Sequence, residues 1–442
     1  MTLASFSRRG ALLACVASTF WLASCGGSDS DTGTTHMRAL NLTSDLASVD
    51  LFTDDVSRFS GVATDVVTAS TDFTSGSYTV KVKRTGDGAA LLTGSYSVAQ
   101  DQHYTAVVWG RETALRLSTL PEDEDTANIT TGNSRVRLFN ATVDTGTVDV
   151  FLTASNTNLA EAAATQGSLT SGSLAGYRDI STGTYRLRVT GEKNPNDVRL
   201  DIPAVTLNEK TYNTIVLTAG AGGVLVNGTL IVQQGAVTAL KGNKARVRLA
   251  AGVNDGANVS ATVGGSTVSG SVASPRVGGY VLVNAGTAEL VVRVNGAVVS
   301  TTSRSFADGG DYTVLAYGTE AATQVSLLAD DNRLPSTASR AKVRLVNGAL
   351  GESPMTLALD FQPLQPSDIA LGLGSSYYAA DSTTATRIEI SSLTATSPLF
   401  TQVGTADGKL LQSQGVYTVF MLGGAKDSAN LPLTTGVFRR DR

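Results

Sequence analysis

The sequence predicts an all-β protein built from four similar β-sandwich modules in series. A short strand that contains an arginine occurs four times, and a tyrosine follows each of these arginines 64 to 75 residues later. Apolar and polar residues alternate through short runs, as in half-buried strands, while helical periodicity is nearly absent outside 159–165. The tyrosines lie 108, 100 and 105 residues apart, which is the size of one small domain. The repeated residues are Arg38, Arg137, Arg248 and Arg344, and Tyr104, Tyr212, Tyr312 and Tyr417.

The expected strands follow the same order in each module. An opening strand with the arginine precedes a short alternating strand, then a glycine-led alternating strand, and finally a strand that is apolar on both faces. Valine, threonine, tyrosine and isoleucine dominate these runs, and glycine, asparagine and aspartate separate them, as in strands joined by turns. The ranges are 49–52, 76–83 and 104–109; 135–140, 148–152, 183–189 and 212–217; 245–249, 259–263, 286–294 and 312–317; and 341–347, 355–359, 386–390 and 417–422.

The chain is too long for one hydrophobic core, so the repeats are expected to be separate domains. About 100 residues with about seven short strands is the size of an immunoglobulin-like β-sandwich. Residues 26–36 are mostly glycine, serine, aspartate and threonine, which predicts a flexible tether. The expected division is a signal peptide at 1–24, a tether at 25–36, and sandwiches at 37–131, 132–240, 241–338 and 339–442.

The N-terminus has the features of a bacterial lipoprotein signal. Arg8 and Arg9 precede an apolar stretch at 10–23 that is too short to span a bilayer. The sequence Leu-Ala-Ser-Cys at 22–25 resembles a lipobox, in which the peptidase cuts before the cysteine and the thiol carries the lipid. Glycine rather than aspartate at 26 resembles lipoproteins sent to the outer membrane. We therefore expect an exported protein, anchored through Cys25 in the outer membrane of a Gram-negative bacterium.

Composition excludes several kinds of partner and site. The formal net charge is −4, which gives no electrostatic basis for binding nucleic acid. Cys15 would leave with the signal peptide and Cys25 would be lipidated, so no disulfide is expected. With no free cysteine, and with His36 assigned to the tether, tetrahedral zinc ligation is not expected. We expect no cofactor.

The motifs resemble one known bacterial repeat. They comprise Arg-Val-Arg-Leu-x-Asn at 135–140, Val-Asp-Val at 148–150, Gly-Thr-Tyr-x-x-x-Val at 183–189 and Tyr-Thr-x-x-x-x-Gly at 104–110. This set resembles the family named domain of unknown function 4397, found in exported proteins as tandem β-sandwiches. Module two carries the motifs most completely, module one follows, and modules three and four diverge. The resemblance implies a fold, and it implies no catalytic residue.

No catalytic constellation is evident. His103 precedes the last apolar strand of module one without a nucleophile or an opposing carboxylate in sequence reach. Calcium is the one metal considered, because it accepts carboxylate and carbonyl oxygens from loops. Its candidate ligands are Asp123, Asp125, Asp330 and Asp331, in two acidic segments between modules; the alternative is that these segments are solvated linkers.

Two other residue types have expected positions. The arginines of the opening strands alternate with apolar residues, so their guanidinium groups are expected to point to solvent and to pair with acids on a neighbouring strand. Trp109 is the one tryptophan after the signal peptide, and large, mostly apolar residues stand at the equivalent positions. We expect Trp109 to lie in a core rather than on a surface that binds sugars.

These observations favour a non-enzymatic lipoprotein of the cell envelope that acts as a spacer or as an adhesive, ligand-binding array. The partners expected are the membrane, through Cys25, and an unidentified protein or glycan. Modules in series would place the last one far from the membrane, and the insertions at 159–176 and 361–382 are the candidate contact surfaces. Two alternatives are an envelope glycan hydrolase that uses loop carboxylates and an assembly factor that binds partners by β-strand addition.

The lipid anchor can be tested directly. Changing Cys25→Ser removes the only thiol available for lipid attachment after cleavage, so the protein should lose radiolabelled fatty acid and move from the membrane to the soluble fraction. Cys15→Ser is the matched control and should leave both unchanged. Membrane retention of the Cys25→Ser protein at the level of the parent would contradict the assignment.

Overall fold

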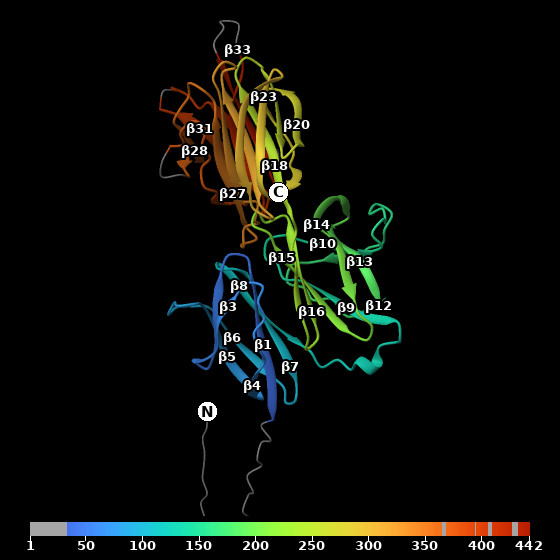
Figure 1. Ribbon diagram of the computed structural model, residues 1–442. Coiled ribbons are helices and arrows are strands. Elements are labelled where there is room, and N and C mark those ends of the chain that lie inside the picture. The colour runs from blue at the N-terminus through green and yellow to red at the C-terminus, as the bar shows by residue number, and fades with distance from the viewer. Residues whose placement is uncertain (1–32, 365–367, 394, 405–408, 427–431) are drawn as a thin grey trace, which may run out of the picture.

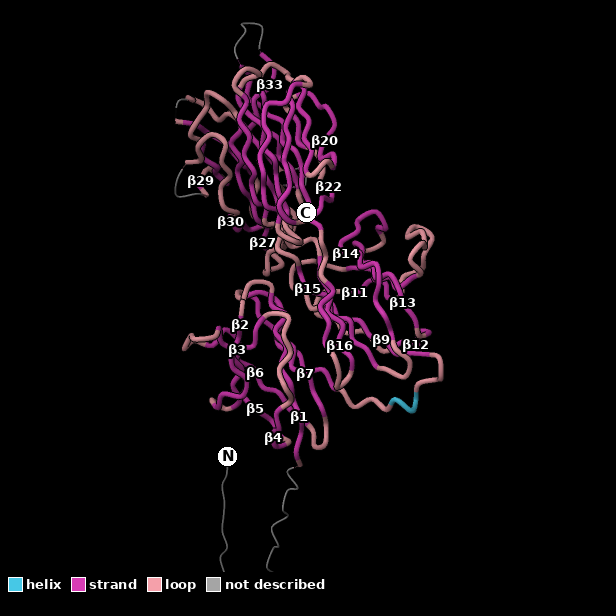
Figure 2. Tube along the Cα trace, viewed as in Figure 1, coloured by secondary structure: helices cyan, strands magenta, loops and turns pink. Residues whose placement is uncertain are grey.

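A computed structural model describes residues 33–364, 368–393, 395–404, 409–426 and 432–442. These residues form eight β-sheets and one short 3-10 helix, η1 (Thr126–Asn128), and strands fill most of the trace in Figure 2. No helix among them is long and apolar enough to cross a membrane. Cys25 lies outside the described residues. The sheets associate in twos, which confirms the predicted all-β fold of tandem sandwiches.

Each sandwich combines an opening sheet, which contains its first strand, with a second sheet. The strands of sandwich one are β1 (Thr34–Thr43), β2 (Ser48–Thr53), β3 (Val56–Ala63), β4 (Thr71–Thr74), β5 (Gly76–Arg84), β6 (Ala90–Val98), β7 (His103–Arg111) and β8 (Ala114–Pro121). Those of sandwich two are β9 (Asn133–Asn140), β10 (Val148–Thr153), β11 (Gln166–Leu169), β12 (Arg178–Ser181), β13 (Gly183–Gly191), β14 (Asn194–Leu207), β15 (Tyr212–Ala219), β16 (Val226–Val232) and β17 (Val237–Leu240).

Sandwiches three and four repeat this arrangement. Sandwich three contains β18 (Lys244–Val253), β19 (Asn258–Val263), β20 (Ser266–Ala273), β21 (Arg276–Val277), β22 (Val281–Asn284), β23 (Gly286–Val294), β24 (Ala297–Phe306), β25 (Asp311–Gly318) and β26 (Thr323–Asp330). Sandwich four contains β27 (Arg340–Gly348), β28 (Met355–Leu359), β29 (Gln362–Pro363), β30 (Tyr378–Asp381), β31 (Arg387–Ser392), β32 (Phe400–Val403), β33 (Val416–Lys426) and β34 (Pro432–Arg440).

The strand order is shared by all four sandwiches. In sandwich one the opening sheet runs β4-β1-β7-β8 and the second sheet β3-β2-β5-β6. The first strand pairs in parallel with the penultimate strand, as β1 with β7, β9 with β15, β18 with β25 and β27 with β33. Constant-type immunoglobulin domains instead place their strands as ABED and CFG. The sandwich architecture is therefore the expected one, with eight or nine strands in a different order.

Each sandwich encloses a hydrophobic core of its own between its two sheets. The core of sandwich three, for example, gathers Val247, Val259, Leu290 and Val314, all fully or almost fully buried. The other three cores likewise draw their buried residues from one sandwich each. Alternation along the strands explains this separation, because successive side chains point to opposite faces of a sheet.

Two further apolar clusters lie between sandwiches. One joins the opening sheets of sandwiches one and two, where Trp109 on β7 packs edge to face on Phe139 of β9, with ring centroids 5.5 Å apart. The other joins the opening sheets of sandwiches three and four through Tyr317, Phe420 and Leu422. The sandwiches are therefore packed in pairs, and Figure 1 shows one pair above the other with the C-terminus between them. The sandwiches follow one another along the chain as predicted, and they also dock in pairs because both faces of each opening sheet carry apolar side chains.

The tyrosine repeat fails in sandwich two by one residue. Tyr104, Tyr312 and Tyr417 each accept a hydrogen bond at the phenol oxygen from the backbone N–H five residues upstream, as in the tyrosine corner of immunoglobulin-type sandwiches. The strand register places Asn213, not Tyr212, at this position. A shift of one residue exchanges the two faces of a strand. In sandwich two, the residue equivalent to Trp109 is consequently Thr218.

This register predicts unequal effects for two neighbouring substitutions. Leu217 is fully buried in the core of sandwich two, so Leu217→Ala should lower the free energy of unfolding by about 2–5 kcal/mol. Thr218 points to the opposite face, and Thr218→Ala should cost less than about 1 kcal/mol. Urea unfolding followed by the fluorescence of Trp109, which contacts sandwich two, measures both. Equal losses for the two variants would contradict the register.

Candidate functional site

The arginines of the opening strands are buried between paired sandwiches. Arg137, Arg248 and Arg344 are 7%, 0% and 2% exposed, so the expectation that these side chains point to solvent is wrong. Their face of the sheet is covered by the opening sheet of the neighbouring sandwich. In every sandwich the Nε of this arginine donates to a threonine directly opposite on the parallel strand. The four bonds, from Arg38 to Thr105, Arg137 to Thr214, Arg248 to Thr313 and Arg344 to Thr418, measure 2.9, 2.8, 2.9 and 3.2 Å.

Sandwiches three and four exchange these arginines reciprocally. Arg248 of sandwich three donates to Asp441 of sandwich four, with Nη2 3.0 Å from Oδ2. Arg344 of sandwich four donates to Asp330 of sandwich three. Each carboxylate also accepts a 2.6 Å hydrogen bond from the threonine of its own sandwich. Asp330 is the last residue of β26, and Asp441 follows β34. In each sandwich, a carboxylate at the end of the last strand thus binds the arginine of the other sandwich.

Tyrosine rings cover these guanidinium groups. The ring of Tyr280 lies 4.5 Å from the guanidinium carbon of Arg248, and the ring of Tyr377 lies 4.7 Å from that of Arg344, within cation–π range. Burial alone would raise the pKa of Asp330, but the charges of Arg344 and Arg248 lower it below its ordinary value. Burial and the charge of Asp330 raise the pKa of Tyr280. Asp330 is therefore ionised at neutral pH, and the interface is a paired, desolvated charge cluster.

In sandwiches one and two, the buried arginine of each sandwich donates to backbone carbonyl oxygens of the other sandwich. In sandwiches three and four, it donates to a carboxylate of the other sandwich. Arg38 donates to the carbonyl oxygens of Val232 and Gly235 in sandwich two, at 3.2 and 2.5 Å, and to Glu122 at 2.9 Å. Arg137 donates to the carbonyl oxygen of Pro121 at 3.1 Å. Burial lowers the pKa of Arg137, and none of the carboxylates in the described part of the chain hydrogen-bonds to its guanidinium to offset this effect.

The two pairs meet at a charged junction. Arg111 of sandwich one donates to Asp144 of sandwich two at 3.1 Å and to the carbonyl oxygen of Leu334, which follows the last strand of sandwich three, at 3.2 Å. Arg442, the last residue, donates to the carbonyl oxygens of Thr145 and Gly223, and burial lowers its pKa to about 10. Side chains or backbone from all four sandwiches thus contact one another at this point.

A close backbone approach completes the junction. Gly220 of sandwich two and Gly309 of sandwich three pass so near that a Cβ on either would lie 2.9 or 2.7 Å from the Cα of the other. The N–H of Gly222 donates to the carbonyl oxygen of Gly309 at 2.8 Å. Gly309 also has a φ of +70°, which favours glycine. Larger residues would push the two pairs apart.

Beside the junction lies a groove of about 550 Å³ where sandwich one approaches sandwich four. Arg111, Arg340 and Lys342 line it, with Asp331 as the carboxylate among its lining residues. Lys342 pairs with Asp331 at 2.9 Å and lies 4.8 Å from the ring of Tyr377. Burial lowers the pKa of Lys342 to about 8, so the amine remains mostly charged at neutral pH. The side chain of Arg340 is exposed and has no hydrogen bond to a described residue.

The calcium candidates lie apart and have other partners. Asp123 bonds to His103 at 2.7 Å and to Gln234 at 3.1 Å, and Asp125 accepts from a backbone N–H of η1. Asp330 and Asp331 pair with arginine and lysine side chains. In the part of the chain that the structure describes, no three His, Cys, Asp or Glu side chains gather as a metal site.

Two other residues, His36 and Trp109, lie at positions that differ from those predicted from the sequence. His36, assigned to the tether, is on β1 and stacks on His103. Trp109 is buried as expected, at 6% exposure, but in the cluster between sandwiches rather than in the core of sandwich one. Of the two insertions, 361–382 contributes Tyr377 and Ala379 to the groove.

A further repeated residue, a tyrosine, was not among the positions predicted from the sequence. Tyr177, Tyr280 and Tyr377 each precede the strand that pairs with the opening strand, and each covers the buried arginine of its own sandwich at 4.6, 4.5 and 4.7 Å. These three tyrosines recur at about the length of one module, so their spacing could have identified them as a repeated position. Asp441 and Arg442 gave no such signal, because they stand outside every repeated strand pattern.

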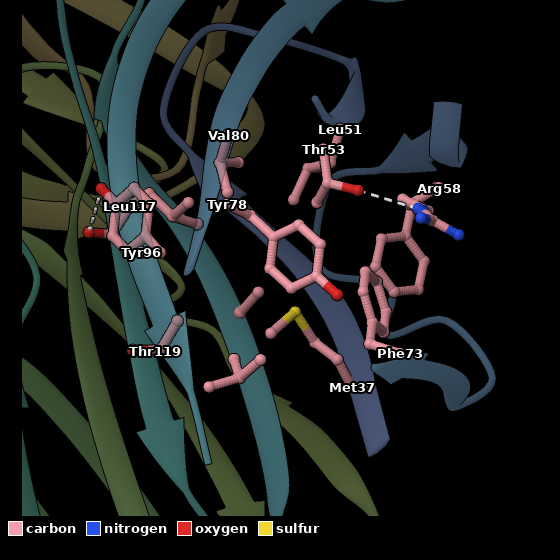
Figure 3. A pocket seen from close by; sticks show the side chains of 13 residues that line it. Met37, Leu51, Thr53, Arg58, Phe73, Tyr78, Val80, Tyr96, Leu117 and Thr119 are labelled. Atoms are coloured by element: carbon pink, nitrogen blue, oxygen red, sulfur yellow. Dashed lines mark hydrogen bonds between the residues drawn. The ribbon is translucent and has the colours of Figure 1, made fainter. Parts of the chain in front are cut away.

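An apolar pocket inside sandwich one is too small for a ligand. Figure 3 shows Met37, Tyr78 and Phe73 among the side chains that line it, between the two sheets. Its volume of about 20 Å³ accommodates about one water molecule. It is therefore a packing defect of the core rather than a binding site.

Comparison with known proteins places this multi-sandwich chain in a family. Residues 35–151 and 245–362, together more than half of the chain, match the family described as "Domain of unknown function (DUF4397)". The chain belongs to this family, which confirms the resemblance seen in the motifs. Both matches begin in the opening strand of an odd-numbered sandwich and end in the first strands of the next, so they favour modules one and three over module two. No curated protein matches the chain.

Two solved structures show limited similarity. A "putative cell adhesion protein" from Bacteroides ovatus is 12% identical, with 46% of this chain and 98% of that chain covered and a TM-score of 0.18. The Bacillus anthracis TIE protein is 9% identical, with 84% of this chain and 65% of that chain covered and a TM-score of 0.14. Neither similarity informs the function.

The reciprocal arginine pairs give a stability prediction. Arg344→Met would leave Asp330 buried without its main partner and should lower the free energy of unfolding by about 3–5 kcal/mol. The matched control is Arg137→Met, at the equivalent position of sandwich two, where no buried carboxylate would be stranded and the loss should be near 1 kcal/mol. Urea unfolding followed by circular dichroism measures both. A loss at Arg344 no larger than at Arg137 would contradict the proposed role of the carboxylate.

Proposed function

We propose that the chain is a non-enzymatic lipoprotein of the cell envelope that acts as an adhesive, ligand-binding body. The observation that carries this proposal is the groove between sandwiches one and four. Three cationic side chains line it, and its carboxylate, Asp331, already pairs with Lys342 and Arg333. A cleft lined mainly by one sign of charge concentrates ligands of the opposite sign.

The chemistry of the groove favours an anionic polymer rich in oxygen. Guanidinium groups bind carboxylate and phosphate in a planar, bidentate geometry, and Arg340 offers such a group to solvent. The volume of about 550 Å³ lies within the range of about 300–1,000 Å³ typical of ligand sites. A glycan that carries uronate or phosphate groups combines this charge with an extended shape. Such polymers suit an adhesive role at an envelope.

The packing of the sandwiches supports the same role. Buried ion pairs join sandwich four to sandwich three, and hydrogen bonds from Arg442 to the carbonyl oxygens of Thr145 and Gly223 join the two pairs. The groove is built from elements of different sandwiches, so its shape depends on their fixed arrangement. A body of this kind presents a preformed surface, which lowers the entropy cost of binding.

The acids of the two large grooves are poor candidates for glycan hydrolysis. A glycosidase needs one carboxyl group with a raised pKa as general acid and a second carboxylate nearby. Burial would raise the pKa of Asp331, but hydrogen bonds from Arg333 and the charge of Lys342 lower it to about 2. Asp330, in the adjoining groove of about 460 Å³, has a lowered pKa as well. Neither could hold a proton at neutral pH.

A charge reversal tests the groove. Arg340→Glu should weaken binding of the protein to immobilised polygalacturonate or polyphosphate at least fivefold, while neutral dextran should bind neither protein. Binding should also fall as pH rises through about 8, where Lys342 loses its proton. The two polymers distinguish carboxylate from phosphate as the preferred group. Surface plasmon resonance at low and moderate salt measures each interaction.

Arg276→Glu provides the matched control, because Arg276 is exposed on β21 and does not line the groove. It changes the net charge equally and should retain binding. Equal losses in the two variants, or no binding of either polymer by the parent protein, would overturn the proposed ligand class.

A further inference from the structure

One buried arginine, Arg38 of sandwich one, lacks the ring that covers the other three. In sandwiches two, three and four a tyrosine ring lies 4.6, 4.5 and 4.7 Å from the guanidinium carbon of the repeated arginine. In sandwich two this ring belongs to Tyr177, which stands opposite Arg137 when the strand pairing is extended by one residue. The same extension in sandwich one places Ser70 opposite Arg38. Sandwich one has therefore kept the arginine and lost the tyrosine.

A cavity of about 280 Å³ lies where the missing tyrosine would be. Arg38, Ser70, Thr68 and Gln234 are among the residues that line it. The side chain of Ser70 is exposed, so the cavity opens to solvent on this side. A cavity of about 150 Å³ in an engineered protein holds a benzene molecule. The cavity beside Arg38 therefore has room for one aromatic ring.

The hydrogen bonds of Arg38 leave the faces of its guanidinium group for such a ring. The Nε donates to Thr105, and the terminal nitrogens donate to Glu122 and to the carbonyl oxygens of Val232 and Gly235. Hydrogen bonds of a guanidinium lie in its plane, whereas an aromatic ring packs against its face. The four bonds thus fix the orientation of the group without competing with a ring.

The cavity also contains an acceptor for a phenol hydroxyl. In sandwich three, the hydroxyl of Tyr280 donates to Asp330 at 2.6 Å, and Asp330 accepts a second 2.6 Å bond from Thr313. Glu122 has the corresponding place in sandwich one, because it accepts a 2.6 Å bond from the equivalent Thr105 and lines the cavity. A phenol beside Arg38 can therefore donate to Glu122 as Tyr280 donates to Asp330.

We propose that this cavity binds one phenolic ring, in the position that a tyrosine of the chain itself has in the other sandwiches. The ring lies against the guanidinium face of Arg38, and its hydroxyl donates to Glu122. Cation–π attraction favours an aromatic ring over a saturated one, and the charge of Arg38 disfavours amines. The stacked rings of His36 and His103 border the same cavity. The ligand is thus a small free phenol or the tyrosine side chain of a polypeptide.

Phenol itself is the direct probe, and we expect saturable binding in a titration followed by nuclear magnetic resonance. Cyclohexanol has the hydroxyl without the aromatic ring, and benzene has the ring without the hydroxyl. Each should bind about fivefold more weakly than phenol, because each loses one of the two interactions. N-acetyltyrosinamide distinguishes the two sources of the ring. Affinity equal to that of phenol indicates a tyrosine side chain, and weaker binding indicates a free phenol; either result supports the site.

Two substitutions at Ser70 provide the matched variants. Ser70→Tyr supplies the missing ring from the chain and should weaken phenol binding at least tenfold, whereas Ser70→Ala keeps the cavity open and should leave the affinity nearly unchanged. Circular dichroism checks that both variants are folded. Unchanged affinity in Ser70→Tyr, equal affinity for phenol and cyclohexanol, or no saturable binding by the parent would overturn the proposal. Ser70 does not line the groove between sandwiches one and four, so polymer binding is tested separately.

Discussion

The structure depends on one recurring interaction, the guanidinium group that each opening strand buries against the opposing sandwich. Its Nε is fixed by a threonine on the parallel strand, and its terminal nitrogens reach the neighbouring sandwich. A buried charge is costly unless it is paired and hydrogen-bonded. The arginine therefore restricts which surface can cover it, because the covering sandwich must bring an acceptor to one place. Apolar contacts around it supply most of the attraction, while the arginine determines register and orientation.

Divergence among the four sandwiches follows the same constraint. Where the covering sandwich offers Asp330 or Asp441, the pair is ionic and the carboxylate stays charged. Sandwich two offers only carbonyl oxygens to Arg38, and the charge of Arg38 is instead neutralised by Glu122, which belongs to sandwich one as Arg38 does. Sandwich one has also lost the tyrosine that covers the arginine. The framework tolerates this loss because Arg38 already makes four hydrogen bonds, and the vacated volume lies next to two histidines.

Much of the fold could be predicted from local patterns. Alternation and turn residues predicted the strands, and the repeat predicted the number of sandwiches. The predictions were wrong for the register of one strand and for the exposure of the arginines. The tyrosine at 212 suggested the wrong register because Asn213 fills the structural position, and a one-residue shift is invisible in a strand that is apolar on both faces. A strand in which arginines alternate with apolar residues has the pattern of a strand with one face exposed to solvent. The sequence of that strand gives no sign that a second sheet covers the arginine face.

The sequence by itself determined the all-β fold, the fourfold repeat and the family, because strand periodicity and framework motifs act within one sandwich. Tertiary structure decided which sandwiches pair, where the arginines are buried, how the cationic groove forms and that His36 meets His103. The physical reason is distance along the chain. Arg248 and Asp441, or His36 and His103, are separated by whole strands and belong to no common local pattern. Their meeting depends on the docking of complete sheets, and no periodicity encodes which face will meet which.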